Sequence, residues 1–120
     1  HCCAARPPVG LMTSAGARVL SLDGTLLGER DDDAVGEAVE SGVRLLLGLV
    51  PSTDAPGRPR AVELAEPARR LWNRLGFPTV DLGETVAVTP TCGLAGASAE
   101  HARRALALAR DTARALGEES

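Results

Sequence analysis

The chain has 120 residues, a formal net charge of −3 and 24 % charged residues, a profile typical of a single globular domain. No apolar run approaches the roughly 18 residues that a membrane span requires, and the negative net charge argues against a nucleic-acid partner. The sequence contains no Lys, which excludes Schiff-base chemistry and a P-loop from this stretch. Its three cysteines, an odd number, predict free thiols in a reducing compartment, the cytoplasm.

The first half of the chain predicts two helices and two strands. A short helix follows Pro8 and ends at Gly16, after which residues 18–23 (RVLSLD) alternate apolar and polar side chains as a strand does. The acidic run at residues 31–33 indicates the start of a second helix. Residues 43–50 (VRLLLGLV) form a nearly continuous apolar run, which is typical of a strand buried on both faces.

The second half continues the alternation. A loop at residues 51–59 precedes a helix that runs to Leu75, opened or kinked by Pro67, with Trp72 on its buried stripe. Residues 84–89 (ETVAVT) predict a third strand. Residues 98–116 predict a last helix with His101 at its surface, and the expected buried positions of that helix are Ala102, Leu106, Ala109, Ala113 and Leu116.

Strands that alternate with helices predict an α/β fold of about three right-handed βα units around a parallel sheet. Periodicity alone fits part of an α/β barrel and part of an open, doubly wound sheet equally well.

Four potential metal ligands lie where predicted strands give way to loops. His1 and Cys3 are two residues apart, which places both side chains on one side of an extended chain, whereas Cys2 points the other way and is assigned to packing. Asp23 ends the strand at residues 18–23, and Cys92 follows the third strand. Because the ends of parallel strands meet at one edge of a sheet, we expect these groups to converge. Imidazole, thiolate and carboxylate groups together form a borderline-soft ligand set, which favours zinc.

The segment GLAGAS at residues 93–98 leads into the last helix. Small residues at a helix N-terminus can present N–H groups to an anion, but the segment matches no phosphate-binding motif. A turn that lets Cys92 reach the metal is the favoured interpretation.

The runs HCC, RVLSLD and TPTCGLAGAS, in this order, resemble the C-terminal part of the cobalamin-independent methionine synthase family. The resemblance implies that residues 1–120 are a C-terminal fragment of a (β/α)8 TIM barrel, an incomplete barrel that lacks its N-terminal part. It also implies that His1, Cys3, Asp23 and Cys92 bind Zn²⁺. The carboxylate ligand of well-studied members is Glu where this chain has Asp23. Long members carry a His near the position of Val50, so the chain is most similar to the short barrel-only relatives.

The function implied by the resemblance is zinc-dependent methyl transfer to a thiol, with homocysteine as acceptor and methyl-folate as donor. The fragment by itself is expected to be inactive. Two alternatives stay open: a related thiol methyltransferase with a corrinoid or other methyl donor, and a non-catalytic barrel remnant. The residues that bind the amino acid would precede His1.

Overall fold

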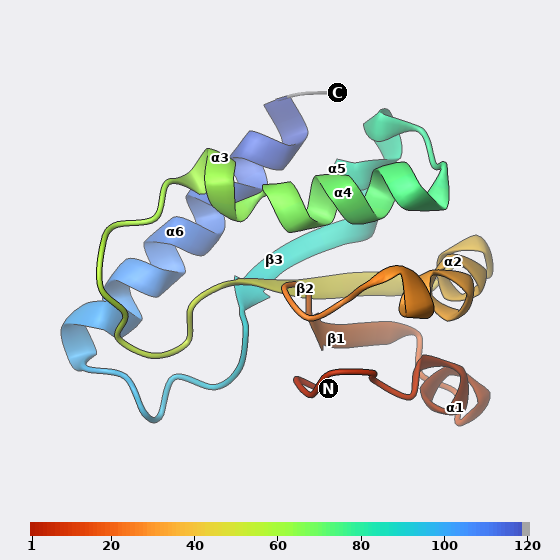
Figure 1. The fold of residues 1–120 in the computed structure, drawn as a ribbon, viewed down its shortest axis with the longest axis horizontal. Coiled ribbons are helices and arrows are strands. Elements are labelled where there is room, and N and C mark those ends of the chain that lie inside the picture. The colour runs from red at the N-terminus through yellow and green to blue at the C-terminus, as the bar shows by residue number, and fades with distance from the viewer. Residues whose placement is uncertain (119–120) are drawn as a thin grey trace.

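A computed structural model describes residues 1–118, so the last two residues of the predicted 1–120 domain lie outside the described residues. Helices and strands alternate as predicted (Figure 1). In chain order the elements are α1 (Val9–Ser14), β1 (Val19–Asp23), η1 (Glu29–Asp31), α2 (Asp32–Glu40), β2 (Arg44–Val50), α3 (Ala61–Leu64), α4 (Glu66–Leu75), η2 (Thr79–Asp81), α5 (Leu82–Thr85), β3 (Val86–Pro90) and α6 (Ala99–Glu118).

The three strands form one parallel sheet in the order β1-β2-β3, which confirms the predicted α/β arrangement. The N-terminal segment extends this sheet beyond β1. Cys2 forms a parallel bridge with Leu22, and its backbone N–H donates to the carbonyl of Ser21 at 2.9 Å. The order along the sheet is therefore the N-terminal segment, β1, β2 and β3.

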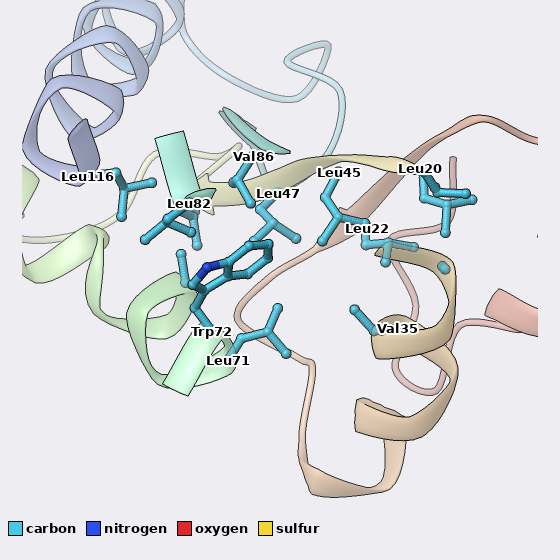
Figure 2. Packing of buried hydrophobic residues seen from close by; sticks show 14 of the residues in the cluster. Leu20, Leu22, Val35, Leu45, Leu47, Leu71, Trp72, Leu82, Val86 and Leu116 are labelled. Carbon is cyan, nitrogen blue, oxygen red and sulfur yellow. The ribbon is translucent and has the colours of Figure 1, made fainter. Parts of the chain in front are cut away.

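One face of the sheet carries the hydrophobic core. In β1 and β2 alternate residues, among them Leu22 and Leu47, are 1 % exposed or less and pack against side chains from the helices (Figure 2). Trp72 is 3 % exposed, lies in this core, and donates its indole N–H to the carbonyl of Pro78, so the packing role predicted for it is confirmed. The helices therefore cover this face of the sheet.

The opposite face is much more open. Val19 is 50 % exposed, Ala87 is exposed, and Ser21 and Leu46 are half-buried. In the register Ser21 lies opposite Leu46, which in turn lies opposite Ala87. The prediction that the second strand is buried on both faces holds only in part, since Leu46 is half-buried.

Several local boundaries differ from the prediction. The third strand begins at Val86, because Glu84 and Thr85 belong to the short helix α5. The helix expected up to Leu75 is two helices, and Pro67 lies in the first turn of α4, where its missing N–H costs no hydrogen bond. The helix predicted at the acidic run is α2, and the short 3₁₀ helix η1 precedes it. The Asp31 carboxylate accepts a hydrogen bond from the backbone N–H of Gly28 at 2.9 Å.

The buried stripe of α6 is rotated from the predicted one. Leu106 is 59 % exposed and Ala113 is exposed, whereas His101 is 7 % exposed. The predicted surface position of His101 is therefore wrong. The buried residues of α6 are His101, Ala105, Ala109, Thr112 and Leu116. Many positions of this Ala- and Arg-rich helix are alanine, so apolar character alone marks no single stripe. None of the helices within residues 1–118 has the length and hydropathy needed to cross a membrane.

Candidate metal centre

The carboxyl ends of the three parallel strands meet at one edge of the sheet. The chain's N-terminus, the loop after β2 and the loop after β3 all lie at this edge (Figure 1). This is where ligand sites are built in parallel α/β folds.

Three of the four predicted ligands converge there. One ligand atom from each of His1, Cys3 and Cys92 lies within 4.8 Å of the other two. The two sulfur atoms are 3.0 Å apart, and the Sγ of Cys92 is 3.9 Å from the Nε2 of His1. We call these three residues the metal centre.

The donor set and its spacing fit a zinc ion. Zinc takes imidazole nitrogen and thiolate sulfur at ~2.0–2.3 Å with tetrahedral angles, which separates ligand atoms by about 3.5–3.8 Å. The observed separations of 3.0 and 3.9 Å lie on either side of this range, and all three ligand atoms lie within 4.8 Å of one another, so the side chains would rotate to reach bonding positions. His1 and Cys92 are exposed, and Cys3 is half-buried. Three ligands would leave a fourth tetrahedral position open.

The two thiols differ in acidity because they share a hydrogen bond. The bond from Cys3 lowers the pKa of Cys92, and the backbone N–H of Gly93 lowers it further. The same contact with Cys92 raises the pKa of Cys3. Cys92 is therefore the first of the pair to become a thiolate, which is the form that binds a metal.

Asp23 lies near the metal centre but is not one of the three converging residues. Its Oδ1 accepts hydrogen bonds from the backbone N–H and the hydroxyl of Thr25, at 2.9 and 2.6 Å. Its negative charge is close enough to act against the lowering of the Cys92 pKa. The structure thus brings Asp23 to the edge of the sheet where the metal centre lies, with its carboxylate directed to Thr25. Its role as fourth ligand stays a prediction.

Ser21 is a residue of this site that the sequence did not indicate. Its hydroxyl oxygen is 2.7 Å from the Nδ1 of His1. In the sequence, Ser21 stands two residues before Asp23, which places both on the same face of a strand. This signal is weak, because many residues without a functional role have the same spacing from a ligand.

A close approach of two backbone segments positions Cys92. A Cβ atom at Gly48 would lie 2.6 Å from the Cα of Thr91. The backbone N–H of Thr91 donates to the carbonyl of Val50 at 2.8 Å, next to an irregularity in the pairing of β2 and β3. Glycine at position 48 therefore allows the chain before Cys92 to cross the end of β2.

A second polar group joins the loop after β2 to the start of α6. The backbone N–H and the hydroxyl of Ser98 both donate to the carboxylate of Asp54, at 2.8 and 2.7 Å. These bonds lower the pKa of Asp54. The Nε2 of His101 lies 2.9 Å from the carbonyl oxygen of Pro51. We call Asp54, Ser98 and His101 the loop clasp.

The contacts of the loop clasp show whether the segment at residues 93–98 is a turn or an anion site. The Ser98 hydroxyl accepts a hydrogen bond from the backbone N–H of His101, as an N-cap does, and the Asp54 carboxylate already binds at this helix end. A second anion would meet that negative charge. The geometry therefore favours the turn over an anion site.

The residue types of the loop clasp are those of a hydrolytic triad, but the contacts are not. In a triad the His ring lies between the acid and the nucleophile. Here Asp54 binds Ser98 directly, and the ring of His101 contacts Pro51. The loop clasp is thus a structural connection.

No family model matches the chain, and neither a curated protein nor a solved structure matches it. The interpretation of the site consequently depends on its geometry and on the sequence motifs.

Proposed function

We propose that the chain carries the zinc site of a thiol methyltransferase, with homocysteine as methyl acceptor. The observation that supports this best is the convergence of His1, Cys3 and Cys92, with one ligand atom of each within 4.8 Å of the others. Two sulfur ligands and one imidazole suit zinc. The motifs that supply them are those through which the sequence resembles the cobalamin-independent methionine synthase family.

In this proposal the residues of the chain hold and orient the metal ion. His1, Cys3 and Cys92 would bind the ion, which would supply the Lewis acidity that keeps a substrate thiol deprotonated near neutral pH. The exposed sides of His1 and Cys92 leave room for that thiol to approach. Methyl transfer then forms a bond between the substrate sulfur and the methyl carbon, and breaks the bond from that carbon to the donor, whose leaving atom takes up a proton. Methyl-folate is the proposed donor.

We propose that this site belongs to a (β/α)8 barrel. The parallel bridge between Cys2 and Leu22 extends the sheet past β1, and the open face on the other side of the core would be a barrel interior. The N-terminal part of such a barrel would complete the sheet and hold the amino acid. A cytoplasmic location would keep the three thiols reduced.

The test is metal analysis and thiol binding on the full-length protein, kept reduced with a phosphine. We expect one zinc per chain. We also expect that homocysteine, and not its oxygen analogue homoserine, changes the visible spectrum of the cobalt-substituted protein. Methyl transfer is then measured with methyl-folate and with a methylcorrinoid as donors, which separates the leading proposal from a relative with another donor. Absence of bound metal, or bound cobalt that does not respond to thiol, would overturn the proposal.

A further inference from the structure

Ser21 contacts the N-terminal segment twice. Its backbone carbonyl accepts the N–H of Cys2 at 2.9 Å, which fixes the backbone beside His1. Its hydroxyl oxygen lies 2.7 Å from the Nδ1 of the His1 ring. The other ring nitrogen, Nε2, faces the sulfur of Cys92 at 3.9 Å. The two nitrogens of His1 therefore have different and separate partners.

A histidine binds a metal through the lone pair of one ring nitrogen while the other nitrogen carries the proton. Which nitrogen carries it is set by the hydrogen bond that this nitrogen makes. An acceptor at Nδ1 favours the tautomer with a proton on Nδ1 and a free lone pair on Nε2. The Ser21 hydroxyl can donate or accept, so it holds the ring of His1 in either tautomer. When Nε2 gives its lone pair to a metal, Nδ1 carries the proton and the Ser21 oxygen is placed to accept it.

We propose that Ser21 is a positioning residue of the metal centre, which fixes the orientation of the His1 ring and accepts the Nδ1 proton when Nε2 binds the metal. This inference rests on the proposed function in one respect, namely that the metal centre binds zinc. The hydroxyl of Ser21 contacts the ring of His1, so its side chain acts on the metal centre through His1. It lies in the middle of β1, half-buried, so its place is set by a regular strand and not by a loop.

The test compares zinc affinities of full-length variants by competition with a chelator, under reducing conditions. We expect Ser21→Ala to weaken zinc binding by roughly 10–100-fold, as loss of an outer hydrogen bond does at other metal sites. Ser21→Thr keeps the hydroxyl and suits a strand, so it should bind zinc nearly as the parent does. Ser41→Ala is the matched control, because the Ser41 hydroxyl contacts the carbonyls of Glu37 and Ala38 at the end of α2.

A double-mutant cycle shows whether the effect passes through His1. In a His1→Ala background, Ser21→Ala should cause no further loss of affinity. Equal affinities of parent and Ser21→Ala would overturn the inference, and so would an equal loss in both backgrounds, which would indicate a general effect on the fold.

A second measurement separates this inference from the proposed function. Histidine-selective ¹⁵N labelling of the metal-free protein reports the hydrogen bond at the Nδ1 of His1. The Nδ1 chemical shift should differ between the parent and Ser21→Ala, because the variant lacks the hydroxyl that contacts this nitrogen. Identical Nδ1 shifts in both proteins would overturn the inference. If the parent binds no zinc but the Nδ1 shift changes, the proposed function fails while the role of Ser21 toward His1 stands.

Discussion

Two polar groups lie at the same edge of the sheet, and they differ in how their atoms are satisfied. In the loop clasp both carboxylate oxygens of Asp54 face donors from Ser98, and the ring of His101 contacts a carbonyl. In the metal centre two thiols and an imidazole nitrogen face one another. The contacts within the loop clasp are strong hydrogen bonds to a carboxylate and a carbonyl. Those within the metal centre are weak hydrogen bonds of sulfur between groups that can bind a metal, so the metal centre is the group that stands to gain from a bound ion.

The histidines of the two groups also differ in exposure. His101 of the loop clasp is 7 % exposed, whereas His1 and Cys92 of the metal centre are exposed to solvent. A buried histidine with a carbonyl partner fixes a loop. An exposed histidine beside two thiols can accept a ligand from solution. The segments that carry the two groups are in contact, because the hydroxyl of Thr91, next to Cys92, donates to that of Ser52, in the loop that carries Asp54, at 3.1 Å.

The comparison predicts that substitutions of two cysteines, Cys92 and Cys2, differ greatly in their effect on zinc content. Cys92→Ser should lose most of the zinc and essentially all methyl transfer, because a serine hydroxyl is not deprotonated at neutral pH and is a poor zinc ligand. Cys2→Ser is the matched control, since Cys2 packs against the core and lies outside the metal centre. Zinc content of both full-length variants provides the measurement. Equal losses in the two variants would contradict the assignment of the metal centre.

Asp23 tests whether the metal centre has a fourth protein ligand. If the carboxylate turns from Thr25 to the ion, Asp23→Asn should weaken zinc binding on the order of tenfold or more. Thr25→Val removes the competing hydroxyl contact and should leave zinc affinity equal or higher. Chelator competition on both variants measures the effect. An unchanged affinity in Asp23→Asn would mean that the metal centre has three protein ligands.

Gly48 tests whether the position of Cys92 depends on the close approach at β2. Gly48→Ala would place a Cβ 2.6 Å from the Cα of Thr91, so the chain before Cys92 must move. We expect zinc affinity to fall by roughly tenfold even though every ligand is kept, comparable to the loss of an outer-shell contact. Gly10→Ala is the control, because a Cβ there meets nothing within 4 Å. Equal affinities of the two variants would show that the loop adapts without cost.

The sequence predicted the parallel sheet and the convergence of His1, Cys3 and Cys92, because strand ends and a two-residue spacing are local patterns. It did not predict the roles of Ser21 and His101. Their partners, His1 and Pro51, are 20 and 50 residues away, and no local pattern encodes such contacts. The direction of the Asp23 carboxylate was not predicted either: the Asx turn to Thr25 is local, but it competes with metal binding for the same carboxylate, and the sequence does not rank the two.

The smallest expected effect concerns the charge in the loop clasp. Because hydrogen bonds from Ser98 lower the pKa of Asp54 in the folded protein, the ionised carboxylate stabilises the fold above its unfolded pKa of about 3.9. This contribution is lost as the pH falls through the lower folded value. Asp54→Asn should therefore slightly lower the melting temperature of the full-length protein at pH 7, and the difference from the parent should shrink below about pH 4. Thermal unfolding at pH 7 and near pH 3 measures it. Zinc affinity should not change, and a loss of zinc in this variant would show that the loop clasp and the metal centre are coupled.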